Sequence, residues 1–141
     1  MISIRNISDV PLHDVLKRSP VAHIPDAEAI LRECVYRSTK VRYGFLDSRL
    51  ACMWGLIPPS LLSQTAYLWL LTTDIVAEHK FLFVRHSQRY VEEALKIYPT
   101  IVGDVIIGNA PARRWLKWLG AEFGQPDKGR VKFVIRRKVL Q

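Results

Sequence analysis

The chain has 141 residues, of which 49% are hydrophobic and 24% charged, which predicts one folded domain over residues 1–141 rather than a disordered chain. Its longest apolar run, residues 66–71, is far shorter than the roughly 20 residues of a membrane-spanning helix, and the first residues lack the pattern of a signal peptide. The net charge is +8, and residues 110–141, with nine Lys or Arg and two Asp or Glu, hold +7 of it. Such a basic segment is typical of chains that bind nucleic acid, an acidic protein surface or a phosphate-bearing ligand.

The first part of the chain predicts a strand, two helices and an antiparallel hairpin. Alternating apolar and polar residues indicate the strands, and apolar residues at helical spacing indicate the helices. Asp47-Ser48 is the expected turn of the hairpin. The expected strands cover residues 1–7, 40–46 and 50–57, a short helix holds Leu12, Val15 and Leu16, and a second helix begins at Pro25-Asp26.

The second part predicts a parallel crossover unit that is followed by a helix and two closing strands. Residues 65–73 are almost continuously apolar, which suits a strand covered on both faces. An amphipathic helix over residues 77–98 and a strand over residues 100–107 complete a β-α-β unit. A helix over 110–119 and strands over 121–123 and 131–139 follow. This order predicts an α+β (α/β) domain with a mixed, mostly antiparallel central sheet.

The cysteine and histidine residues form no recognisable metal motif. Cys34 and Cys52 lack a CxxC spacing, and each is expected to be a small core residue. His79 and His86 lie seven residues apart on the expected long helix, which is too far for a shared ion. No metal is therefore expected, and the lack of a disulfide framework fits a reducing, cytoplasmic setting.

The segment N-A-P-A-R-R-W-L-K-W-L-G-A, residues 109–121, carries the most specific motif. Together with the order of elements it resembles the GNAT superfamily of acetyl-CoA-dependent N-acyltransferases, which commonly place Ala three, Tyr seven, Gly eleven and an aromatic residue twelve positions after an Asn. Asn109, Ala112 and Gly120 match, whereas Leu116 and Ala121 stand at the tyrosine and aromatic positions. The chain also resembles a divergent group of small podophage internal virion proteins with a GNAT-like fold, in its G-N strand end and its L-G-A-x-F segment.

The resemblance implies that acetyl-CoA binds where two central parallel strands diverge. The pantetheine arm would pair with the strand that ends at Leu71 and Thr72, and the pyrophosphate would lie at the start of the next helix, near His79 and Lys80. The family's loop carries glycines that allow close approach to the phosphates. Residues 77–82, A-E-H-K-F-L, contain none, so an ordinary helix start is the alternative interpretation.

Asp104 is the candidate general base, because attack on a thioester needs a neutral amine. A carboxylate that is bound to a backbone amide or to solvent is the alternative. The position of the family's acid holds Leu116, which has no proton to donate. Asn109 is expected to contact the CoA arm or the amine substrate, or otherwise to cap the helix that follows it. Four tyrosines could supply a phenol, but no spacing selects among Tyr43, Tyr67, Tyr90 and Tyr98.

The candidate partner-binding residues are four arginines of the basic C-terminal segment, namely Arg113, Arg114, Arg136 and Arg137. They stand on the expected last helix and last strand, outside the segment that would hold CoA phosphates, so we expect them to dock an acidic protein partner or DNA. The last strand alternates basic and apolar residues, which predicts one basic face. Trp115 and Trp118 could stack on bases, but these residues, like Trp69, are expected to pack in the core.

Two classes of function remain open from the sequence. The chain is either a divergent acetyl-CoA-dependent N-acetyltransferase or a non-catalytic GNAT-fold protein of virion assembly or host takeover, which binds a virion or host protein. A further hypothesis, that the chain is a nucleic-acid-binding module, is supported only by its basic charge. The phage resemblance predicts a location in the host cytoplasm or in the virion.

Overall fold

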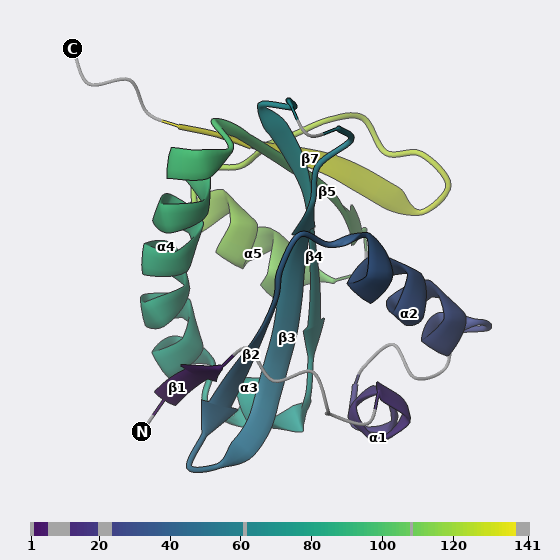
Figure 1. Ribbon diagram of the computed structural model, residues 1–141, viewed down its shortest axis with the longest axis vertical. Helices are drawn as coiled ribbons and strands as arrows, with labels where there is room; N and C mark the ends of the chain where they lie inside the picture. The colour runs from purple at the N-terminus through teal and green to yellow at the C-terminus, as the bar shows by residue number, and fades with distance from the viewer. Residues whose placement is uncertain (1, 6–11, 20–23, 61, 108, 138–141) are drawn as a thin grey trace. The chain divides into compact units, whose positions relative to one another are not determined.

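The computed structural model describes residues 2–5, 12–19, 24–60, 62–107 and 109–137 (Figure 1). Its strands are β1 (Ile2–Arg5), β2 (Val41–Leu46), β3 (Arg49–Ile57), β4 (Thr65–Thr72), β5 (Thr100–Ile106), β6 (Glu122–Phe123) and β7 (Arg130–Arg136). Its helices are α1 (Leu12–Lys17), α2 (Ala27–Arg37), α3 (Asp74–Glu78), α4 (Lys80–Ile97) and α5 (Ala110–Trp118). The predicted order of elements is confirmed with one correction, because two helices replace the single helix expected over residues 77–98. Residues 1, 6–7 and 138–139 of the expected terminal strands lie outside the described residues.

Among the described residues, seven strands form a sheet in the order β1-β2-β3-β4-β5-β7-β6. The strands β4 and β5 are parallel and are connected through α4. The pairs β1–β2, β2–β3, β5–β7 and β6–β7 are antiparallel. The predicted fold class, a mixed and mostly antiparallel sheet with a β-α-β crossover, is therefore confirmed.

The chain divides into two compact units. Unit 1 comprises Met1–Ile57 and Trp69–Phe83, and unit 2 comprises Pro58–Leu68 and Val84–Gln141. Both β4 and α4 contribute residues to each unit. The expectation of a single domain over residues 1–141 stays a prediction.

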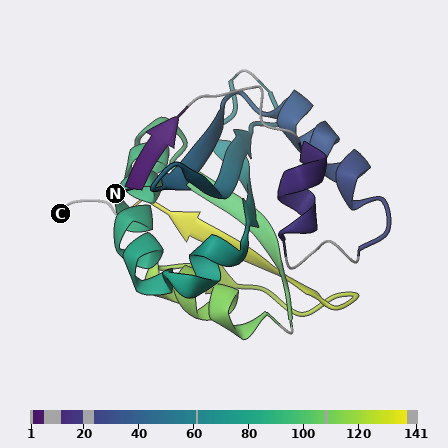
Figure 2. The ribbon, with the colours of Figure 1, turned by 90° about the horizontal axis from the view of Figure 1, so that it is seen from below.

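Unit 1 is built on the β2–β3 hairpin. Asp47 and Ser48 form its turn with φ angles of 48° and 68°, the left-handed conformation that a tight type I′ turn requires at both central positions. Ala51 and Met53 of β3 are fully buried. The helix α1 packs against α2 in the same unit (Figure 2).

A close approach of side chains in unit 1 explains why residue 55 is a glycine. The indole Nε1 of Trp69 donates to Ser38 Oγ at 2.6 Å, and that hydroxyl donates to the Cys34 carbonyl at 2.6 Å. A Cβ on Gly55 would lie 2.6 Å from both Ser38 Oγ and Trp69 Nε1. The predicted core position of Trp69 is confirmed, since the residue is only 7% exposed.

Thr73 connects the end of β4 to both β3 and α3. Its buried hydroxyl donates to the carbonyls of Leu50 and Ala51 at 3.0 and 2.9 Å, and it accepts from the Ile75 amide at 3.4 Å. The last of these bonds caps α3 and satisfies one of the amides that a helix start leaves without an intrahelical partner. Ile75 then packs with Leu46 and Ala51 in the core.

Unit 2 has one buried and one open sheet face over β5 and β7. Val131, Phe133 and Ile135 are buried, while Arg130, Lys132 and Arg136 are exposed, so the predicted basic face of the last strand is confirmed. The buried face is tightly packed, because a Cβ on Gly103 would clash with the Phe133 ring. This packing fixes which residues of β5 point away from the core.

We predict that Thr73→Val lowers the free energy of unfolding by about 1–3 kcal/mol, because it removes the buried hydrogen bonds of the hydroxyl to the Leu50 and Ala51 carbonyls and the cap of α3. Thr73→Ser, which keeps the hydroxyl, should retain most of the stability. Urea unfolding measured by circular dichroism tests this, with Thr39→Val at an exposed position as the control. Equal midpoints for the Val and Ser variants at position 73 would contradict it.

Candidate functional site

Two regions carry the residues that the sequence singled out, one in each unit. In unit 2, the parallel pairing of β4 with β5 runs from Thr65↔Thr100 to Tyr67↔Val102. β5 also pairs with β7 along its whole length, from Thr100↔Arg136 to Ile106↔Arg130. Because directly paired residues share one face of a sheet, the open face carries every second residue of these strands, among them Tyr67 and Asp104.

Asp104 lies on this open face and is exposed. The hydroxyl of Tyr67 donates to its Oδ2 at 3.3 Å, and the register places Lys132 of β7 directly opposite it. The carboxylate is thus bound by a phenol and is open to solvent, and its exposure agrees with the solvent-bound form of the alternative interpretation. The sequence alone could not say which of the four tyrosines would supply a phenol to the site. The hydrogen bond to Asp104 identifies Tyr67 as that residue. No sequence signal could find this pair, because its partners are 37 residues apart and meet only through the parallel register.

In unit 1, the junction of α3 and α4 is the second region. The amide of His79 donates to the carbonyls of Ile75 and Val76, each at 3.2 Å, and its carbonyl accepts from the Phe83 amide at 3.3 Å. His79 therefore ends one helix and begins the next, with φ −130° and ψ 38°. The predicted start at residue 77 was wrong because Thr73, whose side chain is the cap, was assigned to the preceding strand.

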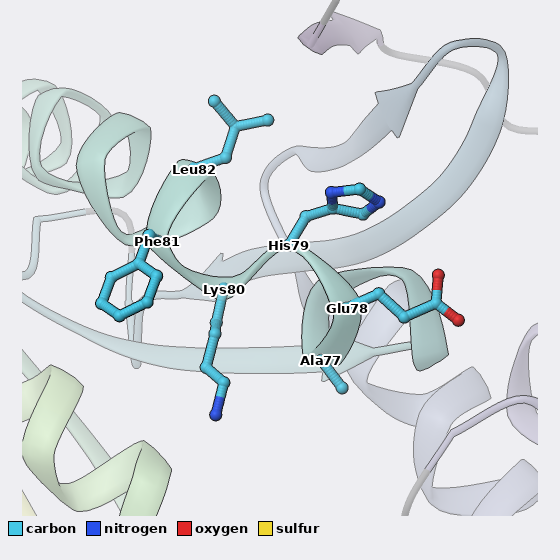
Figure 3. A pocket seen from close by; sticks show the side chains of 6 residues that line it. All are labelled: Ala77, Glu78, His79, Lys80, Phe81 and Leu82. Atoms are coloured by element: carbon cyan, nitrogen blue, oxygen red, sulfur yellow. The ribbon is translucent and has the colours of Figure 1, made fainter.

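Residues 77–82 line an open hollow of about 310 Å³ at this junction (Figure 3). His79 and Lys80, both candidates from the sequence, are exposed there. Figure 3 shows that the side chains of Glu78 and Lys80 leave the junction in different directions. Sequence reasoning missed Phe81, which is 88% exposed. An aromatic residue in a helical stripe predicts burial, and the helix break at His79 changes the face on which Phe81 lies.

The remaining cofactor candidates have structural contacts. Leu71 is buried in the core and Thr72 is half-buried, so Leu71 could meet a ligand only through its backbone. Asn109 Oδ1 accepts from the Ala112 amide at 3.3 Å and caps α5. This agrees with the alternative interpretation of Asn109 as a helix cap. Leu116, at the position of the family's acid, is buried.

The four candidate partner-binding arginines do not form one patch. Arg113 lies over the Phe123 ring at 5.9 Å, whereas Arg136 pairs with Glu122 at 2.8 Å. Glu122 and Phe123 are consecutive in β6 and therefore point to opposite faces of the sheet. Arg113 and Arg136 thus lie on opposite faces, and both Arg114 and Arg137 are exposed.

The tryptophans of α5 differ in their surroundings. Trp115 is half-buried and its Nε1 donates to Ser87 Oγ of α4 at 2.8 Å. Trp118 is 52% exposed, so its expected core position was wrong. The buried stripe of α5 runs through residues 112, 115, 116 and 119, and at 100° per residue position 118 falls about 110° from the centre of that stripe.

The cysteines show no sign of reactivity. Cys52 is buried, as predicted, and burial raises the pKa of its thiol to about 12. Cys34 is half-buried, and burial raises its pKa as well. Both thiols are therefore protonated at neutral pH. Within the described residues there is no group of three His, Cys, Asp or Glu that could hold a metal, and none of the described helices is long and apolar enough to cross a membrane.

A scan of protein-family models finds no match to this sequence, and a search of curated proteins finds no similar sequence. Solved structures do match. A Bacillus subtilis acetyltransferase in complex with CoA has a TM-score of 0.74 at 13% identity, with 98% of this chain and 100% of that chain covered. The ribosomal-protein-S18-alanine N-acetyltransferase from Escherichia coli has a TM-score of 0.72 at 14% identity, with coverage of 100% and 97%. A Desulfovibrio desulfuricans protein described as an acetyltransferase of the GNAT family has a TM-score of 0.74 at 14% identity, with coverage of 96% and 99%.

These matches cover almost the whole chain, and the chain has the fold of GNAT acetyltransferases. The predicted resemblance in fold is therefore confirmed. At 12–15% identity the likeness concerns the fold, and the activity has to be argued from the residues.

We predict that Asn109→Ala lowers the free energy of unfolding by about 1 kcal/mol, because it removes the cap of α5. Asn109→Ser, which can also cap a helix, should be close to the unchanged chain. Thermal and urea unfolding of both variants test this. If the Ala and Ser variants are equally stable, the cap contributes nothing.

Proposed function

We propose that this protein is an acetyl-CoA-dependent N-acyltransferase of GNAT type. The observation that carries the proposal is the match of the whole chain to acetyltransferase structures, one of which holds CoA. It is supported by the order β4, α3, α4, β5, in which the helix start between the two parallel strands opens on a hollow.

The residues at the α3–α4 junction fit the pyrophosphate of CoA. The first amides of an 18-residue helix have no intrahelical partner and carry the positive end of the helix dipole, and α4 presents them at residues 80–82 beside the hollow. Lys80 adds a positive charge. Phe81 and Leu82 carry bulky side chains, which hinder the approach of phosphate groups to the backbone on their side of the helix start. We therefore assign the phosphates to the side of Lys80. Bound acetyl-CoA would supply an acetyl thioester.

Asp104 is the catalytic residue of this proposal. Its carboxylate would hold the ammonium group of the acceptor and take the proton that the amine must lose before it attacks. The hydroxyl of Tyr67 on Oδ2 holds the carboxyl in place and leaves Oδ1 for the acceptor. Leu116 offers no acid, so the rate would rest mainly on the positioning of the reactants.

A second candidate is a non-catalytic GNAT-fold protein that binds a partner in the virion or in the host cytoplasm. The observation that favours it is the outer surface of α5, where Arg114, Lys117 and the half-exposed Trp118 stand with no acidic residue in the helix. Trp and Arg are enriched among residues that dominate binding energy. The partner could be an acidic protein or DNA. DNA binding would weaken steeply with rising salt concentration.

We predict that the protein binds acetyl-CoA and CoA with micromolar dissociation constants in calorimetric titration. Lys80→Glu should weaken binding about 10-fold or more, because it places a negative charge beside the phosphates. Lys96→Glu, at the other end of α4, is the matched control and should bind as the unchanged chain does. Absence of heat at millimolar acetyl-CoA would overturn the proposed function and favour the non-catalytic role.

A further inference from the structure

On the basis of the proposed function, we infer that the acceptor is a peptide N-terminus whose amine is followed by acidic residues, and that Lys132 determines this preference. The inference starts from three neighbouring side chains on the open sheet face of unit 2. The Asp104 carboxylate has Tyr67 on one side, through a hydrogen bond of 3.3 Å. On its other side the antiparallel register with β7 places Lys132 directly opposite.

Two cations of this face are available to a ligand. Among the described residues, neither Lys132 nor Arg130 has an ion pair or a side-chain hydrogen bond, and both are exposed. Arg136, further along β7, is already paired with Glu122 at 2.8 Å. The open face therefore presents one carboxylate beside two cations that form no ion pair among the described residues. A ligand with only a positive charge would bind the carboxylate and leave these two cations without an anionic partner.

The charges and spacing define the complementary ligand. The Cβ atoms of directly paired residues lie about 4.5–5.5 Å apart, so a group bound at Asp104 has a neighbour at Lys132 within the length of one or two residues. A ligand that matches both needs an ammonium group and, a few ångströms away, a carboxylate. An amine followed directly by Asp or Glu has this arrangement.

The exposure of Asp104 indicates an α-amine rather than a lysine side chain. Burial is the usual means of lowering the pKa of a lysine amine, and an exposed carboxylate cannot provide it, since its charge favours the ammonium form. An α-amine has a pKa near 8, against about 10.4 for lysine. Beside the same carboxylate, the neutral fraction of an α-amine is therefore about 250-fold larger than that of a lysine side chain near pH 7.

The extent of this face favours a peptide over a small molecule. Asp104, Lys132 and Arg130 are spread over two neighbouring strands, and an extended peptide readily follows the direction of a strand. Val102 and Val134, paired across β5 and β7 and half-buried, add apolar contact beside the charges. An extended chain laid along β7 could reach Asp104, Lys132 and Arg130 in turn.

The test measures CoA release and, by mass spectrometry, peptide acetylation, using acetyl-CoA and four peptides of equal length. One begins Ser-Glu-Glu, one Ser-Lys-Lys and one Ser-Ala-Ala, and the fourth is the Ser-Glu-Glu peptide with a blocked N-terminus and one internal lysine. We expect kcat/KM for Ser-Glu-Glu to exceed that for Ser-Lys-Lys at least 10-fold, with no acetylation of the blocked peptide. Lys132→Glu should reverse the order of the two peptides, and Lys96→Glu should leave it unchanged.

The outcomes separate this inference from the proposed function. Failure to bind acetyl-CoA overturns the function itself. If acetyl-CoA binds, equal rates for acidic and basic peptides, transfer to none of them, or an unchanged preference in Lys132→Glu overturns the acceptor assignment alone. Acetylation of the internal lysine in the blocked peptide overturns the choice of an α-amine. Calorimetry of acetyl-CoA with Lys132→Glu, expected to match the unchanged chain, shows that the variant is folded.

Discussion

The hydroxyl of Thr73 is the interaction on which the geometry of the proposed cofactor region depends. It donates to two carbonyls at the start of β3 and accepts from an amide of α3, so the end of β4 and the beginning of α3 are fixed by the same atom. The helix α3 then has only five residues before His79 closes it. The first turn of α4, residues 80–82, is exposed after this short helix, and residues 77–82 contain no glycine.

The two faces of the sheet in unit 2 differ in their packing. Phe133 fills the space above Gly103 on the buried face, which leaves no freedom to shift β5 by one residue against β7. A shift of that kind would exchange the faces of every side chain in the strand. The tight packing at Gly103 therefore keeps Asp104 on the open face, opposite Lys132.

The sequence predicted the elements that follow from local patterns. Alternating residues, apolar runs and turn residues were enough to predict the hairpin turn at Asp47-Ser48, the parallel crossover and the burial of Trp69. Features that depend on distant residues were not. The Tyr67–Asp104 hydrogen bond needs the register of two parallel strands, and the separation of Arg113 from Arg136 needs the pleat of β6. The exposure of Trp118 could have been predicted from the sequence, because its angular position on α5 lies outside the apolar stripe.

In the proposed mechanism, the exposed carboxylate and the missing acid have a common chemical consequence. An enzyme whose groups shift the protonation of its substrate can work on an amine of high pKa. Here the carboxylate is exposed and the acid position is a buried Leu116. The proposed reaction would therefore depend on the pKa that the acceptor already has. The proposed chemistry is thus compatible with a narrower set of amines, and the cations beside Asp104 are the groups of this face that could select among them.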